Sequence, residues 1–166
     1  DGWPYLMVST DGGQEPAQRV LAWLADRGIG LVVNPNKAFP DYVLSYGMIW
    51  SFRQTGRFID RRVPAPTGTI EYETILQSGA PTDEYLPAGP RQVLRQFLQE
   101  QSILKPQILV ISPAEGVFDF AISLESLGNP PDEEHSGIAE AISWFLPPHY
   151  NVVLISQKGL PPFVDL

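Results

Sequence analysis

The stretch Gln107–Glu125, with the sequence QILVISPAEGVFDFAISLE, decides the fold of the second half of the chain. Gln107–Ser112 and Val117–Glu125 are both rich in apolar residues, and the short segment PAEG separates them. Two such runs joined by a few residues that include a glycine are typical of a β-hairpin. The stretch therefore predicts two neighbouring antiparallel strands.

Before this hairpin, the sequence predicts one strand and one helix. In residues 69–76, TIEYETIL, the glutamates at 71 and 73 alternate with Ile70, Tyr72 and Thr74. This alternation places the two sets on opposite sides, which is the pattern of a strand. A loop rich in proline and glycine follows. Apolar residues at helical spacing then predict a helix over Pro90–Gln101.

After the hairpin, the sequence predicts a second helix and a last strand. Apolar residues at helical spacing predict a helix that ends before two consecutive prolines, and its apolar face consists of Ile138, Ala141, Ile142 and Phe145. Residues 150–156, YNVVLIS, predict the strand, and we expect the tail after them to pack loosely. The second half therefore has the order β-α-β-β-α-β, which is that of the ferredoxin-like motif.

The first part of the chain adds a strand–helix–strand unit. Trp3–Ser9 predicts a strand, and residues 15–27 predict a helix that ends at Gly28. Ile29–Val33 is wholly apolar and predicts a short strand in the centre of a sheet. Between residues 41 and 54, the pattern fits a strand followed by a short helix.

One segment has the composition of a linker. RRVPAPTG, residues 61–68, contains two prolines and one glycine. We therefore expect an N-terminal lobe over 1–62, a linker over 63–68 and a C-terminal lobe over 69–166, or both lobes packed as one compact domain. The predicted fold class is α+β, with a mixed sheet or sheets and helices.

The composition excludes several classes of protein. A hydrophobic fraction of 43% is too high for a disordered chain, and no run of about 18 apolar residues predicts a membrane span. The formal net charge of −8 repels nucleic acid and anionic membranes, so we expect neither as a partner. The absence of cysteine excludes disulfides and thiolate chemistry and fits a cytoplasmic protein.

The glycine pair in VSTDGGQEP, residues 8–16, raises the question of a phosphate-binding loop. A P-loop needs a lysine and a hydroxyl residue after its glycines, and both are missing here. A dinucleotide fingerprint needs three glycines, but only Gly12 and Gly13 are present, and Asp11 and Glu15 would repel phosphate. We interpret the segment as a tight turn.

The sequence contains no recognisable metal or catalytic motif. The two histidines, His135 and His149, lack the spacing that places metal ligands on one helix face, although Asp132, Glu133 and Glu134 precede His135. No G-x-S-x-G motif occurs. We therefore predict no metal, no cofactor and no catalytic residue.

A cluster of arginines lies next to the most aromatic part of the chain. The segment RQTGRFIDRR, residues 53–62, follows an aromatic stretch, and the candidate binding residues of the two are Tyr46, Trp50, Arg53, Arg57, Arg61 and Arg62. Arginine pairs with carboxylates and phosphates, and large aromatic side chains dominate protein interfaces. The alternative is that the arginines are solvated and the aromatic residues belong to the core.

Two segments resemble the SseB (enhanced serine sensitivity) family. The helix followed by GLVVNP is similar to a helix, strand and Asn-Pro stop of that family, and FDFAISLES with IAEAISWFLPPHYNVVLIS is similar to its C-terminal strand–helix–strand. Together they cover about a third of the chain. The resemblance implies a bacterial, cytoplasmic α+β protein without assigned catalytic residues.

The leading hypothesis for function is a non-catalytic module that binds another protein or regulates it. An acidic inhibitor of a cationic protein is a specific form of this hypothesis, since opposite net charges favour association. The alternative is a small enzyme or a small-molecule binder with a carboxylate-lined pocket between the two halves.

Overall fold

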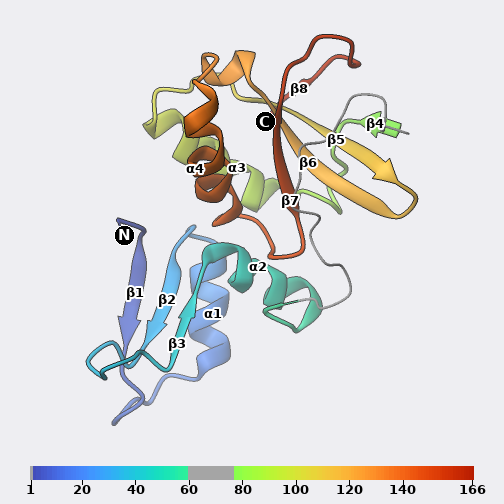
Figure 1. The fold of residues 1–166 in the computed structure, drawn as a ribbon. Coiled ribbons are helices and arrows are strands. Elements are labelled where there is room, and N and C mark those ends of the chain that lie inside the picture. Colours follow the sequence, from blue (N-terminus) through green and yellow to red (C-terminus); the bar gives the residue numbers. More distant parts are fainter. Residues whose placement is uncertain (1, 60–76) are drawn as a thin grey trace.

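The structure is a computed structural model that describes residues 2–59 and 77–166. The described residues form two mixed β-sheets with helices packed against them, which confirms the α+β class (Figure 1). The predicted linker, 63–68, and the predicted strand, 69–76, lie outside the described residues. The predicted division into lobes therefore stays a prediction.

The first sheet contains β1 (Tyr5–Val8), β2 (Gly30–Val33) and β3 (Tyr42–Leu44) in that spatial order. Helix α1 (Ala17–Ala25) connects β1 to β2, which are parallel, whereas β3 is antiparallel to β2. Alternate residues of the strands pack with α1 in one apolar cluster that includes Leu6, Leu21, Leu24, Leu31 and Val33. The predicted strand–helix–strand unit is thus present.

Helix α2 (Tyr46–Thr55) follows β3 almost directly. The hydroxyl of Ser45 accepts a hydrogen bond from the backbone N–H of Met48, which caps the start of the helix. Gly56 ends the helix in the left-handed conformation, with φ of 71°, which a glycine adopts at little cost.

Between residues 88 and 155, the main helices and strands follow the predicted order, with shifted boundaries, whereas the strands at 77–79 and 164–165 were not predicted. The elements of the second part of the chain are β4 (Gln77–Gly79), α3 (Ala88–Glu100), β5 (Gln107–Ala114), β6 (Val117–Ser123), the short 3-10 helix η2 (Glu125–Leu127), α4 (Asp132–Ser143), β7 (Asn151–Ile155) and β8 (Val164–Asp165). The predicted hairpin is confirmed, because β5 and β6 are antiparallel and Ala114 pairs with Val117 beside the turn.

The pairing of the strands does not confirm the ferredoxin-like arrangement. The spatial order is β4-β5-β6-β7, and β8 pairs with β5. In the split βαβ motif, another strand lies between the two parallel strands. Here β6 and β7 are parallel and directly adjacent, with α4 as their crossover. The order of elements along a chain does not determine which strands become neighbours.

Both faces of the second sheet carry buried side chains. One face packs with α3 and α4 in the largest core cluster, to which Ile108, Phe120 and Ile122 belong. The other face carries Leu109, Ile111 and Ala121, and residues of the C-terminal tail cover it. The expectation of a loosely packed tail is wrong, because Phe163 and Leu166 are buried and β8 extends the sheet.

Helix α2 joins the two parts of the molecule. Ile49 lies in the cluster of the first sheet, whereas Tyr46 and Trp50 lie in the large cluster of the second. Near the chain start, the Trp3 ring stacks on Trp144 with the centroids 5.1 Å apart. The indole N–H of Trp144 also donates to the hydroxyl of Tyr5, at 3.0 Å.

Candidate binding site

The predicted aromatic–arginine surface divides into buried and exposed residues. Tyr46 and Trp50 are almost fully buried, and the Tyr46 hydroxyl donates to the backbone carbonyl of Ala25 at 3.0 Å. These two side chains therefore belong to the core and are not part of an accessible surface. Their spacing with Ile49 along α2 is the signal in the sequence that indicated burial.

The arginines of this region differ in their surroundings. Arg53 is exposed and forms an ion pair with Asp26, which neutralises its charge. Arg57 is exposed as well. Arg61 and Arg62 lie outside the described residues. A role for this arginine cluster in binding stays a prediction.

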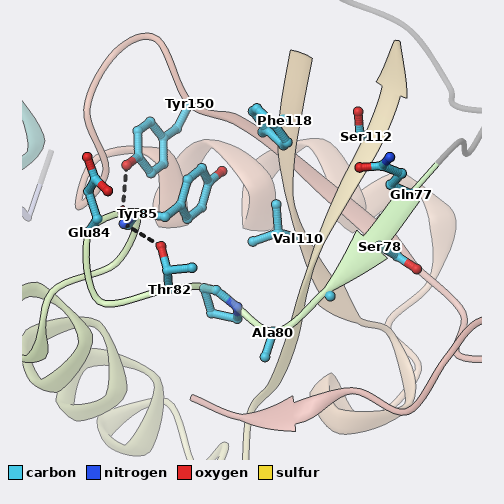
Figure 2. A pocket seen from close by; sticks show the side chains of 12 residues that line it. Gln77, Ser78, Ala80, Thr82, Glu84, Tyr85, Val110, Ser112, Phe118 and Tyr150 are labelled. Atoms are coloured by element: carbon cyan, nitrogen blue, oxygen red, sulfur yellow. Dashed lines mark hydrogen bonds between the residues drawn. The ribbon is translucent and has the colours of Figure 1, made fainter. Parts of the chain in front are cut away.

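A hollow of about 550 Å³ lies at the hairpin end of the second sheet, beside β4. Figure 2 shows around it side chains from β4 and the loop after it, from β5 and β6, and Tyr150 from the position just before β7. The residues that line it are Gln77, Ser78, Gly79, Ala80, Pro81, Thr82, Glu84, Tyr85, Val110, Ser112, Phe118 and Tyr150. This volume is within the usual range of ligand-binding pockets.

The aromatic rings of Tyr85, Tyr150 and Phe118 form much of the wall of the hollow. Tyr85 and Tyr150 stack with their centroids 4.5 Å apart, and the Tyr150 hydroxyl donates to the Tyr85 carbonyl at 2.5 Å. Trp50 packs behind them, edge-on to Tyr150 at 5.7 Å. Phe118 lies across the hollow from this pair in Figure 2, and 52% of its surface is exposed. The core of the protein thus fixes the stacked pair, while Phe118 faces solvent.

The polar groups around the hollow are few. The backbone N–H of Tyr85 donates to the Thr82 hydroxyl at 3.2 Å, which holds the loop after β4. The Glu84 side chain is exposed at the rim, and no described residue forms a hydrogen bond or ion pair with its carboxylate. The Tyr85 hydroxyl is buried and has no hydrogen-bond partner among the described residues.

Burial also changes the acidity of groups near the hollow. It raises the pKa of Tyr150 to about 12. Burial raises the pKa of Tyr85 as well, with further contributions from Tyr150 and Asp119. Both hydroxyls therefore remain protonated at neutral pH, and neither serves as a base there.

Asp119, on β6, is the one fully buried carboxylate among the described residues. Neither of its oxygens has a hydrogen-bond partner, and burial raises its pKa. The side chain of Asn151, which pairs with Asp119 across β6 and β7, opposes this rise. Asp119 follows Phe118, so it points to the opposite face of the sheet and does not line the hollow.

The junction between the two sheets contains two further hollows. One, of about 530 Å³, lies between α2 and α4 and includes Glu140. The other, of about 360 Å³, lies beside α3 and includes Glu100 together with Arg27. Each of these two hollows has a single carboxylate in its lining. The hypothesis of a small enzyme or small-molecule binder instead predicted a pocket lined by several carboxylates between the two halves.

The histidines are not brought together in a metal site. The His135 ring lies 3.0 Å from the Pro130 carbonyl and 3.9 Å from an Asp132 carboxylate oxygen. Within residues 2–59 and 77–166, no three residues of the metal-binding types form a cluster that could hold an ion.

No protein-family model, curated protein or solved structure matches this chain. The resemblance to the SseB family therefore stays a prediction. In the part of the chain that the structure describes, no helix is both long and apolar enough to cross a membrane.

Sequence reasoning missed the residues that form the hollow. Phe118 and Phe120 occupy alternate positions of one strand and so lie on the same face of the sheet, but Phe118 is exposed and Phe120 is buried. The available signal was position, because Phe118 lies at the end of its strand, next to the hairpin turn. Tyr85 comes from a predicted loop and Tyr150 from the start of a predicted strand, and the two meet only in the folded chain.

Proposed function

We propose that this protein is a non-catalytic binding module, which receives a side chain of another protein in the hollow beside β4. The single observation that carries the proposal is the half-exposed Phe118 next to the rigid stack of Tyr85 and Tyr150. In Figure 1, the hairpin end of β5 and β6 projects beyond α3 and α4, so these helices leave that end of the sheet open.

The physical argument rests on burial of the aromatic surface. A complex that covers Phe118 gains about 25 cal/mol for each Å² of apolar surface removed from water. Aromatic anchors with a prearranged wall cost little conformational entropy on binding, which is why they often dominate interface energies. The hydrogen bond from Tyr150 to the Tyr85 carbonyl supplies this prearrangement.

The supported chemistry is recognition rather than catalysis. The described lining contains no histidine, and its two tyrosines have hydroxyls that are protonated at neutral pH. Glu84 is the single acid of the described lining, and none of the lining hydroxyls of Ser78, Thr82 and Ser112 forms a hydrogen bond with it. A general acid–base pair needs a second group within hydrogen-bond reach.

The test is affinity capture from the native lysate with the full chain and two variants. Phe118→Ser removes the exposed ring of the hollow. Phe39→Ser is the matched control, because Phe39 is 85% exposed and precedes β3 of the other sheet. We expect one stoichiometric partner that the wild type and the control retain and that the Phe118 variant loses. Equal capture by all three proteins contradicts the proposal.

A small-molecule binder is the second candidate, and the volume of about 550 Å³ favours it. Thermal shift against a metabolite collection distinguishes the two functions. A ligand that stabilises the wild type and not Phe118→Ser, with no protein captured, supports the small-molecule function instead.

A further inference from the structure

We propose that the group received in the hollow is a guanidinium cation, the head of an arginine side chain on the partner. This inference rests on the proposed function and adds the chemical class of the ligand. Three independent features carry it, which are the charge at the rim, the aromatic wall and an unused hydrogen-bond acceptor.

The charge at the rim is negative. Glu84 is the charged residue of the described lining, and none of the described lining residues is basic. The nearby Asp83 is almost fully exposed and adds a second negative charge to the same loop. A cation that enters the hollow is therefore attracted by a carboxylate that no described basic residue pairs with, whereas an anion is repelled.

One basic side chain approaches this loop, but it is already engaged. An Nη atom of Arg91 lies 3.4 Å from the carbonyl oxygens of both Pro81 and Leu86, and 4.0 Å from an Asp83 carboxylate oxygen. Arg91 comes from α3 and does not line the hollow. It binds backbone carbonyls of the loop, and within residues 2–59 and 77–166 no basic side chain forms an ion pair with Glu84.

The aromatic wall suits a planar cation. A guanidinium group stacks on aromatic faces and is less strongly hydrated than an ammonium group. The exposed ring of Phe118 offers such a face, since no other ring stacks on it among the described residues. The same chain already contains this contact elsewhere, because the Arg27 guanidinium lies over the Trp23 ring, 4.1 Å from its centroid.

The Tyr85 hydroxyl is the unused acceptor. It is buried without a partner, and in Figure 2 it points from the stacked pair toward the side of the hollow where Phe118 lies. A phenolic oxygen accepts hydrogen bonds, and a guanidinium group carries five N–H donors. A guanidinium group stacked on Phe118 can therefore donate to Tyr85, which a neutral apolar side chain cannot do. The Glu84 carboxylate, which Figure 2 shows on the other side of the Tyr150 ring, attracts the cation at longer range.

The experiment is a titration of the isotope-labelled full chain, followed by amide NMR shifts. The probes are two capped tripeptides, acetyl-Gly-Arg-Gly-amide and its neutral analogue with citrulline in place of arginine. We expect shifts confined to residues 77–85, 110–118 and 150 with the arginine peptide. We expect the citrulline peptide to bind about fivefold more weakly or not at all.

Two variants separate charge from shape. Glu84→Gln keeps the shape of the rim. We expect it to weaken the binding of the arginine peptide about fivefold and to leave the binding of the citrulline peptide unchanged. Glu133→Gln is the matched control, because Glu133 is an exposed acid in the first turn of α4. Equal affinity of the two peptides, no shift with either, or no effect of Glu84→Gln overturns the inference.

The two proposals fail in different ways. The captured partner could be lost with Phe118→Ser but kept with Glu84→Gln and when the salt concentration is raised. In that case the hollow binds protein through a neutral side chain, and only the inference of a guanidinium ligand is wrong. If capture is unaffected by Phe118→Ser, the proposed function itself is wrong.

Discussion

The backbone N–H of Gly47 donates a hydrogen bond to the carbonyl of Trp144, with an N–O distance of 3.1 Å. Gly47 lies in the first turn of α2, and Trp144 immediately follows α4, so this bond joins the helices of the two sheets. A Cβ atom at position 47 would lie 1.8 Å from the carbonyl oxygen of Leu146. Only a residue without a side chain permits this approach of two backbones.

Gly47→Ala is therefore expected to lower the free energy of unfolding by about 3 kcal/mol, because the backbone at Leu146 must move to make room. Urea denaturation of the full chain measures this. Gly137→Ala is the control, since Gly137 lies inside α4 and an added Cβ meets no atom within 4 Å. That variant should gain about 0.5–1 kcal/mol from the better helix propensity of alanine. A loss in both variants, or in neither, contradicts the packing described here.

Asp119→Asn is expected to raise the free energy of unfolding at pH 7 by about 1 kcal/mol, because it removes a buried charge that lacks hydrogen bonds. Burial raises the pKa of Asp119 in the folded state above its ordinary value of 3.8. As the pH falls through the raised pKa, the folded wild type takes up a proton that the unfolded chain does not bind, and it gains stability. The advantage of the variant should therefore shrink on acidification and reach its minimum below pH 3.8. Denaturation at several pH values checks this, with the exposed Asp11→Asn as control.

Glu125 is expected to show the opposite dependence on pH. The hydroxyl of Ser156 is the main cause that lowers the pKa of Glu125, and the backbone N–H of Gln157 and the hydroxyl of Ser123 add to it. The stability that these bonds provide is present above the ordinary pKa of 4.5 and is lost as the pH falls through the lowered value. Glu125→Gln should thus cost less than about 1 kcal/mol at pH 7, since the group is exposed, and nothing at pH 2. An equal cost at both pH values is the contradicting result.

Local periodicity was enough to predict most elements of the fold. The hairpin of β5 and β6 and the helices around Leu21, Leu94 and Ile142 follow from spacings of two or of three and four residues. The pairing of strands was not predictable in the same way. Whether β6 pairs with β7 depends on how the α4 crossover packs, which is a property of distant contacts and not of either strand alone.

The candidate site was harder to predict for the same reason. Tyr85 and Tyr150 are 65 residues apart in the sequence, and their stack exists only after the core has formed. Aromatic density along the chain instead indicated Tyr46 and Trp50, which are buried. Aromatic residues fill cores and interfaces alike, so composition alone does not separate the two uses.

The tail provides a further prediction. Phe163 packs on the face of the second sheet that α3 and α4 do not cover. Phe163→Ala is expected to cost about 3 kcal/mol in urea denaturation, because it leaves a cavity over Ile111 and Ala121. Pro162→Ala, at the exposed position before it, should cost little. A cost near zero for Phe163→Ala would instead indicate that the tail packs loosely.

The stacked tyrosines allow a prediction in which two similar changes give different results. Tyr150→Phe keeps the stack but removes the hydrogen bond to the Tyr85 carbonyl, and it is expected to cost about 1 kcal/mol in urea denaturation. Tyr85→Phe also keeps the stack, but it removes a buried hydroxyl that has no partner. This change should leave stability unchanged or raise it slightly, since no bond is lost and the desolvation cost of a polar group disappears.

The same pair of variants distinguishes a structural hydroxyl from one retained for binding. If Tyr85→Phe leaves stability intact and weakens the arginine tripeptide, while Tyr150→Phe mainly reduces stability, the Tyr85 hydroxyl serves the ligand. If Tyr85→Phe costs as much stability as Tyr150→Phe, its hydroxyl has a partner within the fold. The hollow would then lack the acceptor that favours a guanidinium group over a neutral one.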